Sequence, residues 1–224
     1  MPKPSDLLQG YTWDAGSGRY RGPTGRYVAR TRVLDLLSSS MHDREQRMLR
    51  GTTAFVEGRI TARTWVSRES TMLKREYLQN AALAAGGWDR LTPRDYGRIG
   101  GKLRAEYGRI AAMADQVTAG EVSAAQALNR VRMYQGGARS MYYATERDHL
   151  PEAERGMVYL ERRVLGPTED HCTQCPQFYD LGWQYEGTLP IPGSESDCGN
   201  NCLCDLLRKQ VPANEAENWI GTKG

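Results

Sequence analysis

Cysteine is absent from the first 171 of the 224 residues, and the whole chain has only three histidines and two phenylalanines. Long hydrophobic runs are absent as well, since no stretch approaches the roughly 18 apolar residues that a membrane-spanning helix needs. Residues 1–6 have no apolar run behind their lysine, so we expect no secretory signal. Membrane proteins and secreted precursors are therefore disfavoured.

An excess of charge of one sign is also missing. The 30 lysines and arginines nearly balance 27 aspartates and glutamates, and a net charge of +3 does not by itself indicate a nucleic-acid-binding protein. The sequence has no Gly-x4-Gly-Lys-[Ser/Thr], His-Glu-x-x-His or Gly-x-Ser-x-Gly motif. Three histidines also make most histidine-dependent active sites hard to build. We therefore predict that the protein is not an enzyme.

Residues 30–163, in contrast, have a helical pattern. Thr92, Pro93 and Asp95 form a helix start signal, because a capping hydroxyl, a proline in the first turn and an early carboxylate all favour a helix N-terminus. Apolar residues then recur every three or four positions to about residue 117, as on one face of an amphipathic helix. We predict a helical domain over this range.

The helical signals repeat along the chain. Ser123 begins a capping box behind Gly120, and a similar turn surrounds Gly58, which lies 62 residues earlier. The sequence thus predicts two related helical hairpins, over residues 30–85 and 92–149.

Two glycine pairs, at 100–101 and 136–137, fall inside the predicted helices. Each glycine there costs about 1 kcal/mol relative to alanine. Close helix packing, a kink or a contact with another chain could account for either pair, and the sequence does not distinguish these explanations.

Residues 1–29 are expected to form an extended arm. Gly-Arg-Tyr occurs at 18–20 and again at 25–27, with the turn signal Gly-Pro between the two copies. Exposed Tyr, Trp and Arg are favoured at protein interfaces. A short hairpin, a tail packed on its own domain and an arm lying on a neighbouring subunit all fit this segment.

The five cysteines all lie between residues 172 and 204. A Cys-x-x-Cys turn brings two thiolates within reach of one ion, and a second group farther along can complete a tetrahedron of sulfur ligands. We predict one structural zinc ion, with His171 as a weaker candidate ligand. Cys172 and Cys175 are the first pair, Cys202 and Cys204 complete the set, and Cys198 is a substitute. The candidate metal ligands are Cys172, Cys175, Cys198, Cys202 and Cys204.

Other roles for these cysteines stay open. Cys172 and Cys175 could form a disulfide, as could two of the last three cysteines, although an odd number leaves one unpaired. A thioredoxin-like Cys-x-x-Cys should follow a strand and begin a helix. Here residues 176–197 have no helical period, and we expect a loop or short hairpin whose order depends on the bound ion.

The predicted fold class is mainly α, with helical hairpins forming the body and a small irregular zinc-binding module at the C-terminal end. The corresponding segments are an arm over 1–29, a helical domain over 30–163, a cysteine-rich module over 164–207 and a tail over 208–224.

The cysteine-rich segment also carries a longer pattern: Gly-Pro-x-x-Asp-x-Cys-x-x-Cys, a Gly-Trp step, a Leu-Pro-x-Pro-Gly turn and a closing Cys-x-Cys. The residues of this pattern are Gly166, Pro167, Asp170, Cys172, Cys175, Gly182, Trp183, Leu189, Pro190, Pro192, Gly193, Cys202 and Cys204. In these residues the chain resembles phage head morphogenesis (minor capsid) proteins, broadly the Mu F-like group. The likeness covers about residues 164–207, and a weaker one extends upstream through residues 129–134.

Two features depart from that family. Its better-known members end in His-x-x-Cys-Arg-Cys, whereas this chain has Cys198, three intervening residues and then Cys202-Leu203-Cys204. Some distant relatives carry an ADP-ribosyltransferase domain with a catalytic Glu-x-Glu. Residues 152–154 and 215–217 have that spacing, but without the strand-rich context and upstream arginine motif that the activity requires, so we interpret them as solvated surface.

The resemblance implies a virion structural protein that acts by protein contacts in the head, near the portal vertex, with a non-catalytic zinc ion. The implied partners are portal, major capsid or connector subunits and further copies of this chain in a symmetric ring. The implied location is the virion, and the host cytoplasm during assembly. The alternative is a DNA-associated or enzymatic (ADP-ribosyltransferase-like) zinc protein packaged with the genome. Its phosphate contacts would come from Arg19, Arg21, Arg26, Arg30 and Arg32.

Overall fold

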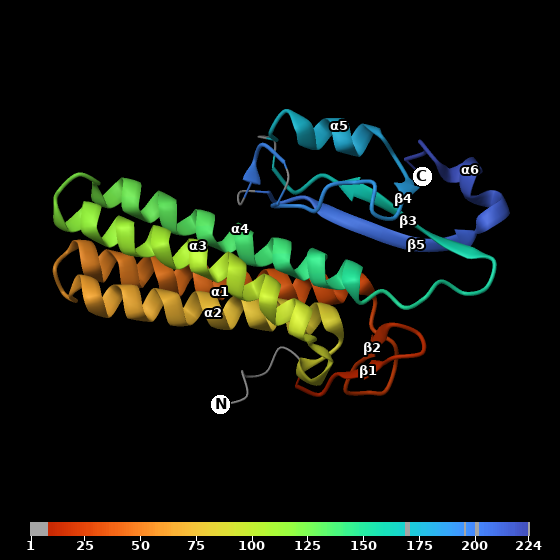
Figure 1. Ribbon diagram of the computed structural model, residues 1–224, viewed down its shortest axis with the longest axis horizontal. Helices are drawn as coiled ribbons and strands as arrows, with labels where there is room; N and C mark the ends of the chain where they lie inside the picture. The colour runs from red at the N-terminus through yellow and green to blue at the C-terminus, as the bar shows by residue number, and fades with distance from the viewer. Residues whose placement is uncertain (1–8, 169–170, 195, 200–201, 224) are drawn as a thin grey trace.

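The computed structural model describes residues 9–168, 171–194, 196–199 and 202–223. Four long helices form a bundle, a small β-hairpin packs at one end of it, and a three-stranded sheet with short helices lies beside it (Figure 1). The mainly α prediction is confirmed. Asp170, part of the phage-like pattern, lies outside the described residues.

The four long helices form the two predicted hairpins. They are α1 (Arg30–Val56), α2 (Ala62–Ala85), α3 (Pro93–Thr118) and α4 (Ala124–Asp148). Thr92 and Ser123 both form complete capping boxes, in which each side chain accepts a hydrogen bond from a backbone N–H three residues on. The helix starts were predictable because caps depend on residues that are close in sequence. A further short 3-10 helix, η1 (Trp88–Arg90), follows α2.

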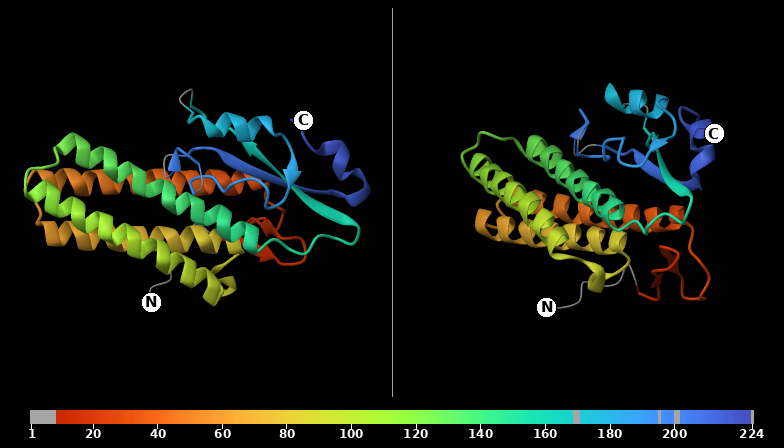
Figure 2. Two further views of the ribbon diagram at one scale, coloured as in Figure 1. Left: turned by 45° about the horizontal axis from the view of Figure 1, so that its top comes forward. Right: turned by 45° about the vertical axis from the view of Figure 1, so that its right-hand side comes forward.

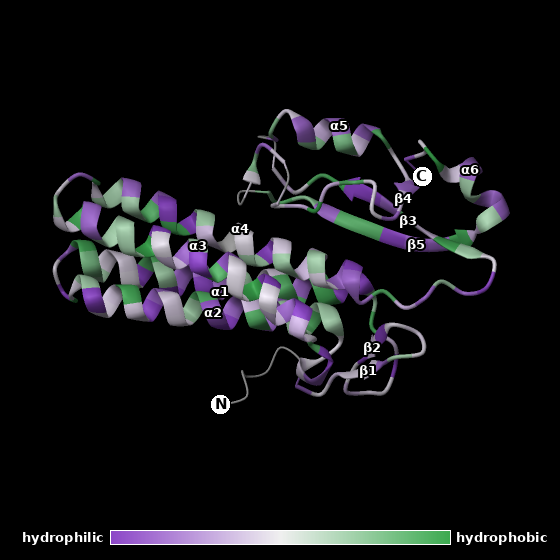
Figure 3. Cartoon of the chain, in the orientation of Figure 1, coloured by the Kyte–Doolittle hydropathy of each residue, from purple (hydrophilic) through white to green (hydrophobic). Residues whose placement is uncertain are grey.

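The bundle core is built from the apolar face of each helix. Figure 3 shows apolar and hydrophilic residues alternating around the helices, as expected of amphipathic helices. Trp65 on α2 is fully buried, stacks on Phe55 of α1 with ring centroids 5.0 Å apart, and donates a hydrogen bond from Nε1 to Thr52 Oγ1 at 3.1 Å. Burial of each large side chain of this kind contributes about 1.5–3 kcal/mol. In the part of the chain that the structure describes, no helix is both long enough and apolar enough to cross a membrane.

The N-terminal arm, in its described part, folds back on its own bundle. Strands β1 (Thr12–Asp14) and β2 (Arg19–Arg21) pair antiparallel, with Trp13 opposite Tyr20. The Tyr20 hydroxyl donates a hydrogen bond to the Leu83 carbonyl at 2.8 Å, and both residues are buried. Of the three arrangements open to the arm, the structure therefore has a hairpin packed on its own domain.

Gly86 links this hairpin to the end of α2 and permits a direct test. Its φ is +92°, and a Cβ there would lie 2.3 Å from Cδ2 of Trp13. Gly86→Ala should lower the free energy of unfolding by about 2–3 kcal/mol, because the left-handed conformation is strained and the indole must move. Gly58→Ala is the matched control, since Gly58 has φ +72° and open space around it, and it should cost only about 1 kcal/mol. Equal losses in urea unfolding would show that Trp13 does not hold the hairpin there.

The C-terminal region differs from the irregular module that we predicted. Strands β3 (Met157–Val164), β4 (Gln184–Tyr185) and β5 (Asp205–Pro212) form an antiparallel sheet in the order β4-β3-β5, and Figure 2 shows it lying along the bundle near α4. The predicted boundary at 163/164 falls inside β3, and the one at 207/208 falls inside β5. The tail contains η3 (Ala213–Glu215) and α6 (Ala216–Trp219).

These strands were missed because they lack the alternation of apolar and polar residues that marks a half-buried strand. Glu161 and Arg163 on β3 are fully buried, where apolar residues would normally stand. Residues 176–197 were expected to form a loop or hairpin, but the first part of this segment belongs to the helix α5 (Gln174–Asp180). Pro176 is compatible with that helix because it lies in the first turn, where no intrahelical N–H bond is needed.

The two glycine pairs have different surroundings. Gly136 and Gly137 are buried, and a Cβ added to Gly193 of the C-terminal region would lie 3.1 Å from the Gly136 carbonyl oxygen. Gly100 and Gly101 are exposed, with nothing within 4 Å of an added Cβ. The second pair therefore lies where the C-terminal region packs closely on the backbone of α4, whereas the first pair faces open space.

Candidate metal centre

The five cysteines come from two chain segments that the fold brings together. Cys172 precedes α5 and Cys175 lies in its first turn, whereas the other three lie in the turns before β5 and immediately ahead of it. Cys175, Cys202 and Cys204 are buried to 2% exposure or less, and Cys172 and Cys198 are half-buried. Together they form a small cluster of their own, separate from the apolar cores of the bundle and the sheet.

The thiol groups are spaced for a shared ion. Sulfur atoms of Cys172, Cys175 and Cys198 all lie within 4.8 Å of one another, and so do those of Cys175, Cys202 and Cys204. The Cys175 Sγ is 3.5 Å from Cys198 Sγ and 3.9 Å from Cys202 Sγ. Sulfur atoms at the corners of a tetrahedron around an ion with bonds of about 2.3 Å would be about 3.8 Å apart. The cluster can therefore hold a metal ion, with Cys175 common to both groups.

The structure also bears on the disulfide and thioredoxin-like roles that the sequence left open for these cysteines. All five are free thiols in the structure. Cys175 lies in a helix, but the described residues between β3 and α5 form no strand. A thioredoxin-like motif requires a strand directly before the helix. His171 belongs to neither sulfur group among the described residues, so this weaker candidate is not brought into the cluster. All five predicted cysteines are.

The pKa values of the thiols are shifted in different directions. The Cys204 thiol donates a hydrogen bond that lowers the pKa of Cys202 to about 4, and the same bond raises the pKa of Cys204. Burial raises the pKa of Cys175 and brings that of Cys198 to about 11. The pKa of Cys172 is lowered as well, and a bound cation would displace the protons that remain on its ligands.

Close backbone contacts hold the two segments in place. A Cβ on Gly166 would lie 2.5 Å from the Leu203 carbonyl oxygen, and a Cβ on Gly182, which has φ +64°, would lie equally close to Gly221. Gln174 Oε1 accepts a hydrogen bond from the Asp197 N–H at 3.0 Å, which joins α5 to the turn before Cys198. Two of the glycines in the phage-like pattern thus stand where no side chain fits.

A buried ion network, which the sequence did not indicate, fixes the sheet to α4. Glu161 on β3 accepts hydrogen bonds from Arg147 Nη2 at 3.1 and 3.2 Å and from the Leu189 N–H at 2.8 Å. Arg163 donates a hydrogen bond to the Pro190 carbonyl, and the Arg139 guanidinium pairs with Asp205 at 2.6 Å. These residues lie close together only in the folded chain. The sequence therefore shows the charged residues of β3 but not the partners that they contact.

The remaining predicted positions are separate from the cluster. Residues 152–154 lie in the connector between α4 and β3, and residues 215–217 span η3 and α6, so neither Glu-x-Glu lies on a strand. Of the arm arginines, Arg19 and Arg21 stack on the Tyr27 ring, and Arg30 pairs with Glu146. Arg21 also pairs with Asp14 at 2.8 Å.

Comparison of the chain with protein-family models, with curated proteins and with solved structures found no match. The cysteine cluster and its contacts with the fold are therefore the observations on which a function can be argued.

Proposed function

We propose that this chain is a virion structural protein of the minor capsid or head morphogenesis kind. In this proposal it acts by protein contacts in the phage head near the portal vertex, without catalysis, and a zinc ion bound by its cysteines holds the C-terminal region in a rigid form. The observation that carries the proposal is the cluster of five thiols, three of them buried, which coincides with the residues that resemble the Mu F-like group.

The donor set supports zinc in a structural role. Soft thiolate ligands select zinc, copper(I) or iron–sulfur clusters, and a sulfur tetrahedron is typical of structural zinc. A catalytic zinc normally has three protein ligands, including histidine or carboxylate, and keeps one position for water. Five thiols are enough to fill every position with sulfur, so the ion would join α5 to the start of β5 and activate no water.

The region held by this ion also offers contact surface. Leu203, between the last two cysteines, is 49% exposed, and Leu181 and Tyr185 at the end of α5 and in β4 are exposed to a similar degree. Large apolar side chains that stay exposed beside a rigid centre are suited to burial against a partner. The proposed partners are portal, major capsid or connector subunits and further copies of this chain.

The DNA-associated alternative has less support. Three of the five arginines named for phosphate contacts are already engaged within the chain, by Tyr27, Asp14 or Glu146. Each phosphate contact made by a free arginine would add to the salt dependence of DNA binding, and few arginines of the arm remain for it.

The test uses purified phage particles from a host that carries the gene. Mass spectrometry should find the chain in the particles, and electron microscopy should place it at the portal vertex with ring symmetry. A Cys175→Ser variant should be lost from particles or give a defective vertex, whereas His171→Ala should be incorporated normally. The proposal would be wrong if complete particles assembled without the chain, or if the protein stayed in the soluble fraction throughout infection.

A further inference from the structure

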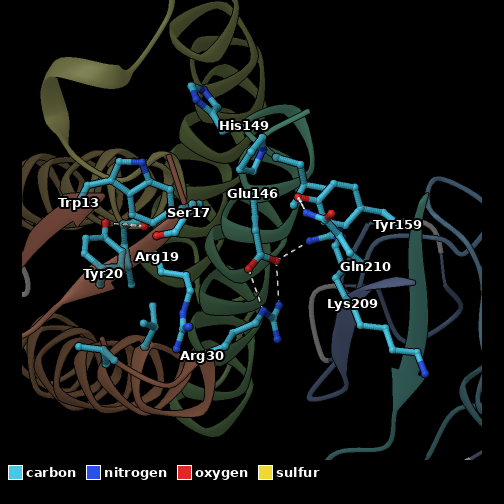
Figure 4. Close-up of a pocket in the computed structure, with 18 of the residues that line it drawn as sticks. Trp13, Ser17, Arg19, Tyr20, Arg30, Glu146, His149, Tyr159, Lys209 and Gln210 are labelled. Carbon is cyan, nitrogen blue, oxygen red and sulfur yellow. Dashed lines mark hydrogen bonds and ion pairs between the residues drawn. The ribbon is translucent and has the colours of Figure 1, made fainter. Parts of the chain in front are cut away.

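A pocket of about 450 Å³ lies where the arm hairpin, the bundle and the sheet meet (Figure 4). Its walls come from β1 and β2, from α1, α2 and α4, from the connector after α4 and from β3 and β5. Pockets that hold small organic ligands have volumes of about 300–1,000 Å³. The space is therefore large enough for such a ligand, and it lies away from the cysteines.

A charged group lies in the wall of this pocket. Arg30 binds both carboxylate oxygens of Glu146, with N–O distances of 2.9 and 2.8 Å, as the dashed lines in Figure 4 show. Arg208 Nη1 donates to the same carboxylate, and the Tyr142 hydroxyl donates to it at 3.1 Å. Two guanidinium groups thus share this carboxylate, and Arg208 Nε also lies 3.7 Å from Glu161 Oε2.

The polar atoms left over in the pocket point to the chemistry of a ligand. Within the described part of the chain, Arg30 Nη1, Arg208 Nη2 and Trp13 Nε1 are buried without a hydrogen-bond partner. The Arg208 side chain is only 4% exposed. All three atoms are donors, whereas both oxygens of Glu146 already accept hydrogen bonds. A buried donor without a partner costs about 1–3 kcal/mol, so a ligand that brings acceptor oxygens would be favoured here.

The remaining charges of the lining balance. Lys209 and Arg19 contribute to the lining, but their cationic groups lie over the rings of Trp219 and Tyr27. His149 is bound to Asp95. The other charged side chains are two cations and two carboxylates, so the donors without partners, and not an excess of charge, favour an anionic head group. These side chains are Arg30, Arg208, Glu146 and Glu154.

The rest of the wall is apolar or aromatic. The residues that provide it are Trp13, Tyr20, Val28, Val33, Leu83, Ala84, Tyr142, Leu150, Pro151, Met157 and Tyr159. Sites for small molecules combine such walls with a few polar groups that orient the ligand. We propose that this pocket binds a small organic anion, whose carboxylate or phosphate contacts Arg30 and Arg208 and whose apolar body lies against the aromatic and aliphatic wall.

The test compares four probes on the wild-type protein: phenyl phosphate, phenylacetate, neutral benzyl alcohol and inorganic phosphate. Binding is followed by NMR of the ¹⁵N-labelled protein, through the indole N–H of Trp13 and the side-chain Nε–H of Arg30 and Arg208. At least one aromatic anion should saturate these signals with a Kd of about 1 mM or tighter. Benzyl alcohol and inorganic phosphate should bind at least tenfold more weakly, and the tighter of the two anions identifies the preferred head group.

Arg30→Gln should weaken that binding at least tenfold, because it removes one guanidinium from the head group. Arg32→Gln is the matched control, since Arg32 is exposed on the same helix and does not line the pocket. Equal binding of benzyl alcohol and the anions, shifts confined to residues outside the pocket, or unchanged affinity in folded Arg30→Gln would each overturn the proposal. The comparison of probes on the wild-type protein decides the question even if the variant does not fold.

Discussion

Cys175→Ser is expected to weaken zinc binding about 100-fold or more. Cys175 belongs to both groups of three sulfur atoms, so its loss removes a ligand from any set of four that includes either group. Structural zinc binding is worth about 10–16 kcal/mol at neutral pH, so one of four ligands accounts for roughly 3 kcal/mol. Competition with a chromophoric chelator measures the change, and elemental analysis should find about one zinc ion per wild-type chain.

The same substitution should loosen the segment that the ion holds. Limited proteolysis should become faster between residues 176 and 197, while circular dichroism of the helical bundle changes little. Chelation of the metal from the wild-type protein should have the same effect. His171→Ala is the control, because His171 lies beside the cluster without belonging to either sulfur group, and it should leave both affinity and proteolysis unchanged. Unaltered zinc content and protease resistance in Cys175→Ser would rule out the metal clip.

Glu161→Gln should cost about 3–5 kcal/mol of unfolding free energy. Glu161 is fully buried, accepts hydrogen bonds from Arg147 and from the Leu189 N–H, and lies 3.7 Å from Arg208 Nε. Removing its charge leaves buried guanidinium groups poorly compensated, which is the costly way to break a buried ion pair. In a chain of this size the melting temperature should fall by roughly 6–20 °C.

An exposed ion pair provides the comparison. Glu57 pairs with Arg59 at the turn after α1, and both side chains are more than half exposed. Glu57→Gln should therefore change the unfolding free energy by less than about 1 kcal/mol. If both substitutions had equally small effects on thermal and urea unfolding, the buried network would not be what fixes the sheet to α4.

The helical part of the fold could be predicted because its signals are local. Thr92 and Ser123 cap their helices through contacts within three residues, and the apolar periodicity of each helix extends over a few turns. The candidate metal ligands could be predicted for a related reason. A Cys-x-x-Cys turn followed by further cysteines favours a metal site by residue type and spacing alone, and the structure brings these five thiols together.

The sheet could not be predicted in the same way. β3 and β5 pair across more than forty residues, from Met157 opposite Pro212 to Val164 opposite Asp205. On β3 a buried carboxylate and a buried guanidinium replace the apolar residues that would reveal a strand. Such charges are tolerated only because partners from α4 and from the loop at residues 189–190 reach them in the folded chain.

By itself, the sequence determines the four helices, their two hairpins and the five thiols of the candidate metal centre. Only the tertiary structure decides that the arm packs on its own bundle, that Cys175 joins two groups of sulfur atoms, and that Arg30, Glu146 and Arg208 meet around a pocket. These last three residues are 116 and 62 positions apart along the chain. Local preferences act over a few residues, whereas charge compensation and close packing depend on neighbours that only folding supplies.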